Sequence, residues 1–215
     1  GIREAVATGL GAMIFTSLAA GRAQWRRGAL EWPLLRRWTP GLMLGGLGAG
    51  TLASLLPEIA LTRFLGVFLA AIALIFLTRW QPPAQRRHPE ATGTTALALG
   101  SGLLSGLAGI AGGNIIVPTL IFFNISPVRA AAQSSALGVP VALAGALGYA
   151  VLPSVSLPGT LGALYLPAVA ALAVGAMISA PQGVRLAHRV PALALRRAFA
   201  VLLLAAALRL ISKTL

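Results

Sequence analysis

The sequence predicts an all-α membrane protein that crosses the bilayer several times. Of its 215 residues, 57% are hydrophobic and only 10% are charged, and the mean hydropathy is +0.86. A soluble domain carries far more charge than this. Long uncharged stretches, such as 39–57 and 130–184, alternate with short basic connectors. Since a helix needs about 20 mostly apolar residues to span a bilayer, the composition excludes a water-soluble globular domain.

The formal net charge of +13 is concentrated in the connectors between the apolar stretches. Basic residues mark the cytoplasmic loops of membrane proteins, so we interpret this charge as a topology signal rather than as a nucleic-acid surface. A bacterial-type inner membrane is the expected location. The three basic connectors contain Arg22, Arg26, Arg27, Arg36 and Arg37, then Arg79, Arg86 and Arg87, then Arg185, Arg189, Arg196 and Arg197.

Six segments are predicted to span the membrane, and a seventh is predicted to enter and leave on the same side. The six spans are about 5–20, 39–56, 64–80, 130–152, 161–180 and 198–212. The stretch 91–128 has 38 uncharged residues and would be about 57 Å long as one helix, against a hydrocarbon core of about 30 Å. Its glycines and Pro118 disfavour a continuous helix. We therefore expect a re-entrant pair of half-helices over about 94–125.

The spans are predicted to form an inverted repeat, with residues 1–90 as the first copy and 91–215 as the second. Arg3 aligns with Arg129, and Pro40 and Gly48 fall on Pro167 and Gly175. The basic connectors place the two copies in opposite orientations, as in many secondary transporters. Under this repeat, a re-entrant partner is expected before Arg3, outside the given sequence.

The predicted bend of the re-entrant pair is a candidate anion site. It contains Gly112, Gly113 and Asn114. Exposed backbone amides and the positive end of a half-helix favour an anion without a basic side chain. Glycines that only allow close helix packing are the alternative interpretation.

Polar and basic residues near the starts of the spans complete the candidate site. A polar cluster opens the span after the bend, two hydroxyls lie in the first span, and two arginines occupy equivalent places where they would guide an anion. Hydrogen bonding between helices explains the polar residues equally well. The candidates for binding are Gln133, Ser134, Ser135, Thr8 and Ser17, and those for guidance are Arg129 and Arg3.

Enzymatic functions find little support, and no catalytic residue, metal site or cofactor is predicted. The chain has no Cys and no Asp, and its four Glu residues lie at or beyond the span ends. His88 and His188 fall in basic connectors. Proton coupling usually uses a carboxylate or histidine within the membrane, so a facilitator, or coupling through the substrate's own proton, is the expected mode.

Two motifs resemble the repeated signature of the TauE/SafE sulfite exporter family of membrane permeases. One is the Gly-rich run 106–118, and the other is Arg129-Ala-Ala-Ala-Gln133-Ser134-Ser135, of which 5–9 looks like a first copy. The resemblance implies transport of sulfite, thiosulfate or organosulfonates, usually outward. It also implies that Gly112, Gly113 and the 133–135 cluster belong to the family's motif regions. Asn114 stands where a third Gly is frequent, and Gln133 replaces the commoner Thr.

The predicted function is therefore export of a small sulfur-containing anion across the inner membrane. The expected partners are the anion and the lipid bilayer, without nucleic acid, and a homo-oligomer is left open. A non-transporting membrane assembly protein and an anion channel are the alternatives that the sequence does not separate from a carrier.

Overall fold

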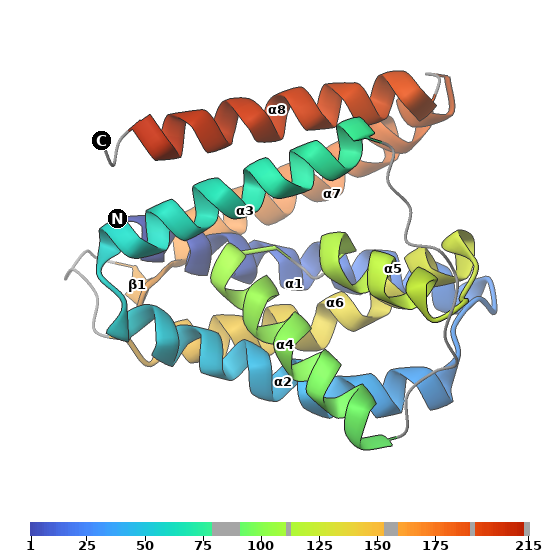
Figure 1. The fold of residues 1–215 in the computed structure, drawn as a ribbon, viewed down its shortest axis with the longest axis horizontal. Helices are drawn as coiled ribbons and strands as arrows, with labels where there is room; N and C mark the ends of the chain where they lie inside the picture. The colour runs from blue at the N-terminus through green and yellow to red at the C-terminus, as the bar shows by residue number, and fades with distance from the viewer. Residues whose placement is uncertain (79–90, 111–112, 153–158, 190–191, 213–215) are drawn as a thin grey trace.

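A computed structural model describes residues 1–78, 91–110, 113–152, 159–189 and 192–212. Within them the chain forms helices joined by short connectors, together with one two-stranded hairpin (Figure 1). The helices are α1 (Ile2–Arg26), α2 (Trp32–Leu55), α3 (Glu58–Thr78), α4 (Ala91–Ala108), α5 (Gly113–Phe122), α6 (Pro127–Ala150), α7 (Leu166–Arg189) and α8 (Ala192–Ser212), and the strands are β1 (Thr160–Leu161) and β2 (Leu164–Tyr165).

Each predicted span overlaps a helix in the part of the chain that the structure describes. Among these residues, three helices are long and apolar enough to span a membrane by themselves, over Ile2–Arg26, Glu58–Thr78 and Val128–Ala150. Two shorter apolar helical stretches, Gly93–Ala108 and Leu166–Ser179, accompany them. The all-α membrane architecture is thus confirmed at the level of its helices.

Residues 161–165 are an exception, because the prediction that a span begins there is wrong. They belong to the β1–β2 hairpin, in which Thr160 pairs with Tyr165. Gly159 and Gly162 have φ angles of +87° and +56°, a conformation that glycine adopts at little cost. A Cβ on Gly162 would lie 1.9 Å from the carbonyl oxygen of Ala150, so this turn requires glycine and α7 starts only at Leu166.

Helices α1, α4 and α5 end in the same way, at a residue with positive φ. These residues are Gly28, Gly109 and Asn124, with φ angles of +65°, +66° and +65°. In each case the next residue donates its N–H to the carbonyl five positions earlier, at 3.1 Å for Ala29, 3.0 Å for Ile110 and 3.1 Å for Ile125. This is the Schellman arrangement, which satisfies carbonyls that the helix leaves open.

The break between α4 and α5 therefore comes from its glycines. Pro118 lies inside α5, and the helix continues across it. The expectation that Pro118 interrupts a helix is wrong. The expected discontinuity lies between Ala108 and Gly113 instead, and the predicted bend residue Gly112 falls outside the described residues.

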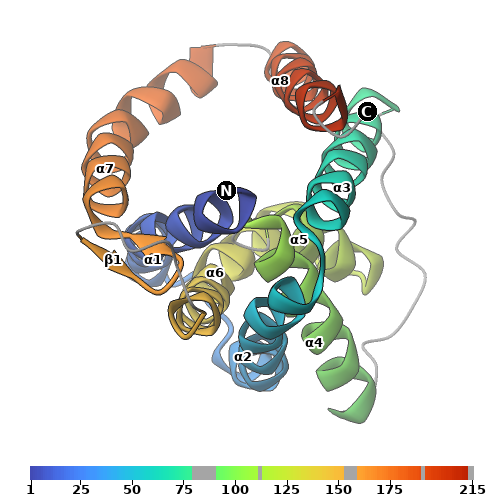
Figure 2. The ribbon, with the colours of Figure 1, turned by 90° about the vertical axis from the view of Figure 1, so that its left-hand side faces the viewer.

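Helices α1 and α6 form an antiparallel pair at the centre of the molecule (Figures 1 and 2). Gly21 faces Ala136 and Gly145 faces Leu10, so the two axes approach closely along most of their length. Helix α2 packs on α6, α4 packs on α2, α7 packs on α1, and α3 pairs with α8. The central pair thus connects all the layers that surround the candidate site.

Glycines allow the close contact between α2 and α4. A Cβ on Gly45 would lie 2.1 Å from the carbonyl oxygen of Leu99, and one on Gly102 would lie 2.4 Å from that of Leu42. Small residues permit such close approach in membranes, where the lipid gives no hydrophobic force to drive helices together. The packing interpretation thus holds for these glycines, which lie outside the predicted bend.

Candidate functional site

The α4–α5 break lies directly against the first third of α1. A Cβ on Gly109 would come within 3.2 Å of the Val6 side chain, and one on Gly9 would lie 3.8 Å from the carbonyl oxygen of Gly109. Ile110 packs against the core cluster that contains Val6, Leu10 and other buried residues. The break is therefore held by a central helix.

Helix α5 returns along α6 after the break. Ile116 and Leu120 are fully buried in a cluster that includes Ala130 and Leu137 of α6. In Figure 1, α4 starts and α5 ends in the right-hand half of the molecule, where the α1–α2 connector also lies. Of the predicted bend residues, Gly113 and Asn114 form the start of α5, a few residues after the turn at Gly109.

The polar cluster at the start of α6 contacts the α1–α2 connector. The Gln133 side chain is fully buried. Its Nε2 donates to the carbonyl of Ala29 at 3.2 Å, and its Oε1 accepts from the N–H of Glu31 at 3.2 Å. The carboxylate of Glu31 also forms an ion pair with Arg129, one turn before Gln133. We call these three contacts the α6 clasp, because they join α6 to the residues that precede α2.

The two serines beside Gln133 have different surroundings. Ser134 is buried, with 4% of its surface exposed. The hydroxyl of half-buried Ser135 donates to the Ala131 carbonyl of its own helix at 2.9 Å. Ser135 therefore satisfies its hydroxyl within α6.

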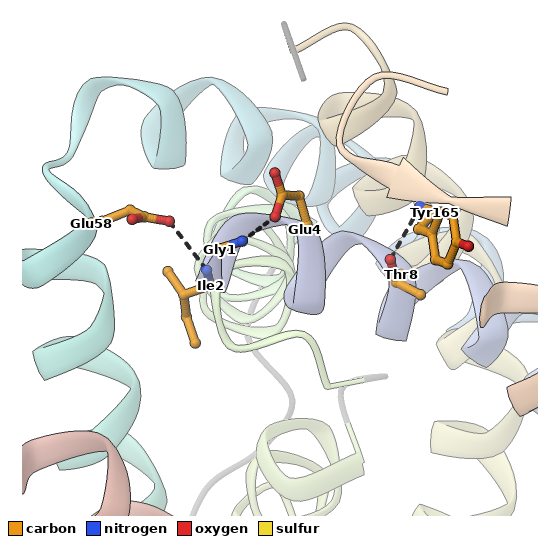
Figure 3. Close-up of polar contacts among 6 residues, drawn as sticks. All are labelled: Gly1, Ile2, Glu4, Thr8, Glu58 and Tyr165. Carbon is orange, nitrogen blue, oxygen red and sulfur yellow. Dashed lines mark hydrogen bonds and ion pairs between the residues drawn. The ribbon is translucent and has the colours of Figure 1, made fainter. Parts of the chain in front are cut away.

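Thr8 and Arg3, two of the predicted residues of α1, lie toward the end of the α1–α6 pair opposite the α6 clasp, whereas Ser17 lies in the second half of α1. Thr8 is buried, and its hydroxyl accepts the N–H of Tyr165 at 3.2 Å (Figure 3). Arg3 donates to the carbonyl of Leu56 in the α2–α3 connector at 2.5 Å. Ser17 is buried in the second half of α1. Figure 3 also shows that Glu58, just after that connector, accepts the N–H of Ile2 at 3.2 Å.

The structure thus places the predicted residues at two ends of one helix pair. Arg3 lies close enough to Tyr149 of α6 to act on it electrostatically. Tyr149 and Gln133 are separated by sixteen residues of α6, which is about 24 Å of helix. A small anion cannot contact Arg3 and Gln133 at the same time. The two residues therefore either lie at opposite ends of a transport path or make two separate structural contacts.

Two further polar residues of the site are not among the sequence candidates. Tyr149 and Ser105 are fully buried, and their hydroxyls have no hydrogen-bond partner among the described residues. The Nε of Arg3 is likewise buried and without a partner. Buried polar groups are normally satisfied, so these donors are available to a ligand. A tyrosine within an apolar span is the one sequence signal that would have indicated Tyr149.

The fold and these contacts define a class of protein, namely a helical integral membrane protein. Comparison with known sequences identifies it further. The chain belongs to the family described as "Sulfite exporter TauE/SafE", whose profile matches residues 1–210. This family consists of membrane transporters and not of enzymes. The family predicted from the two sequence motifs is thereby confirmed.

One curated relative is described as "Probable membrane transporter protein YdhB" from Bacillus subtilis (strain 168). It is 27% identical over 161 residues, which cover 69% of this chain and 63% of the relative. The match therefore spans less than two thirds of that protein's length. No solved structure matches the chain.

Proposed function

We propose that this protein is a secondary carrier that exports a small sulfur-containing anion across a bacterial inner membrane. Sulfite, thiosulfate and organosulfonates are the candidate substrates, because the family description names sulfite export. The observation that carries the proposal is the α4–α5 break, which is held against α1 at Gly9 and Val6.

The break offers donors that suit an anion. The first N–H groups of a helix have no partner within the helix, and a helix N-terminus carries roughly half a positive charge. Helix α5 begins just after the break, and its start, Gly113, carries no side chain that would keep an anion from the backbone. Discontinuous helices bind anionic substrates in this way in other transporters.

An inverted repeat is supported by helix lengths and packing partners. Helices α1 and α6 have 25 and 24 residues, α2 and α7 have 24 each, and α3 and α8 have 21 each. Helix α1 packs on α6 and α3 on α8, while α2 packs on α6 just as α7 packs on α1. A two-fold axis between α1 and α6 would generate this pattern.

The alignment that suggests the repeat needs one change. Pro33 and Pro167 are each the second residue of their helix, whereas Pro40 is the ninth residue of α2. Pro33 and Gly41, rather than Pro40 and Gly48, are therefore the counterparts of Pro167 and Gly175. The division into repeats at residue 90 is kept in this proposal, with α4 and α5 belonging to the second copy.

Arg3 and Arg129 would then lie at the two mouths of the transport path. Arg129 forms an ion pair with Glu31, so most of its charge is compensated. Arg3 donates to a carbonyl, and its Nε is buried near Tyr149. Of the two arginines, Arg3 has a buried donor, its Nε, without a partner among the described residues, and we assign anion binding to it.

The test is uptake of labelled sulfite and thiosulfate into proteoliposomes. Loss of a charged hydrogen bond to the anion costs about 1.5–3 kcal/mol, so Arg3→Gln should lower kcat/KM about 10- to 100-fold, while glutamine can still donate to Leu56. Arg209→Gln is the matched control, since it removes an exposed charge from α8. Equal effects of the two substitutions would contradict a direct role for Arg3.

The same assay separates the alternatives. Flux that does not saturate with concentration indicates a channel. Absence of flux, together with no thermal stabilisation by any anion at millimolar concentration, indicates an assembly protein, because a ligand at about 100 times its Kd stabilises the folded state by about 2.7 kcal/mol.

A further inference from the structure

An apolar groove runs between α1 and α2 and does not include the α4–α5 break. It has a volume of about 710 Å³. Phe15, Leu18 and Trp25 of α1 line one side, Trp32 and Leu35 of α2 line the other, and α6 forms the floor at Leu137. We call this the α1–α2 groove. None of the predicted binding residues lines it.

The length of the groove corresponds to one leaflet of a bilayer. It extends along α1 from Phe15 to Trp25, which is about 15 Å of helix. The hydrocarbon core is about 30 Å thick, so the groove covers about half of it. Phe15 and Leu18 are 45% and 50% exposed. A groove of this length, with large exposed apolar side chains, suits an acyl chain.

One end of the groove carries the residues expected at a lipid headgroup. Trp25 and Trp32 meet edge to face with ring centroids 6.5 Å apart, and they are 61% and 52% exposed. Tryptophans in such positions mark the membrane–water interface. Arg22 lines the groove beside them, and Arg26 and further exposed arginines lie on the adjoining surface.

Among the residues that the structure describes, one acidic side chain lies in the α1–α2 connector at this end of the groove. Glu31 is the acidic residue of the connector, and its carboxylate is already paired with Arg129 in the α6 clasp. A basic pocket between helices on the cytoplasmic side is typical of a site for acidic lipid headgroups. The topology predicted from the basic connectors places this end on that side.

We infer that the α1–α2 groove binds an anionic phospholipid of the inner leaflet. One acyl chain lies between Phe15, Leu18 and Leu35, and the phosphate lies beside Arg22 at the level of the two tryptophans. The lipid would support the α1–α2 connector and thereby the α6 clasp. This inference does not depend on which anion the protein carries.

The test uses brominated lipids, which quench tryptophan fluorescence on contact. The full chain is reconstituted in phosphatidylcholine vesicles, and dibromo-phosphatidylglycerol is compared with dibromo-phosphatidylcholine at equal mole fraction. We expect stronger quenching by the anionic lipid. The experiment uses a Trp80→Phe background, because Trp80 lies outside the described residues. In this background, Trp25→Phe combined with Trp32→Phe should remove most of the difference, since the remaining Trp38 is fully buried.

Two pairs of variants examine the headgroup and the chain separately. A basic residue near the surface contributes about 1 kcal/mol to binding of anionic lipid, so Arg22→Gln should reduce the preference for phosphatidylglycerol about fivefold, whereas Arg197→Gln on α8 should leave it. Ala19→Phe should fill the groove and weaken quenching by both lipids. Ala20→Phe is the control, because Ala20 is also exposed but does not line the groove. This variant should leave quenching by both lipids unchanged.

Three results would overturn the inference. Equal loss in Arg22→Gln and Arg197→Gln would mean that general surface charge attracts the lipid. Equal quenching in Ala19→Phe and Ala20→Phe would mean that no chain occupies the groove. Relief of quenching by sulfite or thiosulfate would mean that the groove belongs to the substrate path.

Discussion

Replacement of Gln133 by alanine distinguishes a structural role from a substrate-binding role for this fully buried residue of α6. The substitution removes both amide contacts with the α1–α2 connector, at Ala29 and Glu31. It leaves a carbonyl and an N–H without partners in a partly buried place, and each such group costs about 1–3 kcal/mol. We expect a destabilisation of about 3 kcal/mol in total.

The measurement is the thermal unfolding midpoint of the purified protein in detergent, together with anion transport. For a chain of this size, 1 kcal/mol shifts Tm by about 2–4 °C, so Gln133→Ala should lower Tm by about 6–12 °C. Ser135→Ala is the control, because its hydroxyl donates only within its own helix. That variant should change Tm by less than about 2 °C.

The reasoning is refuted if Gln133→Ala keeps its Tm and loses transport. In that case the Gln133 amide contacts the substrate rather than the connector, which is the role that the sequence analysis predicts for it. A lowered Tm with a normal KM for the anion would establish the α6 clasp as structural.

Two further predictions concern glycines, each with a glycine control on the same helix. Gly109→Ala should lower stability by about 1–2 kcal/mol, because alanine is strained at positive φ. Gly100→Ala is its control and should be neutral or stabilising, since a Cβ at that position meets nothing within 4 Å. The Tm of each variant is measured, and equal values would exclude a strained turn at the break. Gly45→Ala should lower stability by about 1–3 kcal/mol through overpacking of α2 on α4. Gly48→Ala is its control and should change stability little, because its Cβ would make an ordinary 3.7 Å contact. Similar Tm values for these two variants would contradict the α2–α4 contact.

The helices could be predicted because their signal is local. Apolar stretches of the right length correspond to α1, α2, α3, α6, α7 and α8, and the glycine-rich middle of 91–128 corresponds to a break. The helix ends were less accurate. Helix α1 continues to Arg26 beyond the predicted end at residue 20, because basic side chains can extend toward water at a membrane surface, and the helix stops only where Gly28 takes a positive φ.

The β1–β2 hairpin could not be predicted from hydropathy. The sequence Thr160-Leu-Gly-Ala-Leu-Tyr165 carries no charge and runs directly into the apolar span that follows it. What turns it into a hairpin is the close approach of Gly162 to Ala150, a tertiary contact that composition does not contain. Hydropathy indicates whether a segment prefers lipid or water, and it does not indicate the backbone conformation.

The binding site stays a prediction, and the contacts of its candidate residues could not be predicted from the sequence. Gln133 and Thr8 were recognised because a polar residue in an apolar span needs a partner. The partners lie 102 to 104 residues away for Gln133 and 157 residues away for Thr8, and no local pattern indicates them. Tyr149 was missed because an aromatic residue fits an apolar span without any polar partner.

Those two long-range contacts have the same form, which argues for a common origin. Gln133 of α6 accepts the N–H of Glu31, the residue just before α2. Thr8 of α1 accepts the N–H of Tyr165, the residue just before α7. In the proposed inverted repeat, each central helix therefore anchors the start of the other copy's second helix, and the two anchors lie at opposite ends of the α1–α6 pair. In the proposed carrier, these anchors would close the two ends of the path. A single hydrogen bond contributes about 1 kcal/mol net, so the Thr8 end, with one such contact, would open at lower cost than the α6 clasp, which has three.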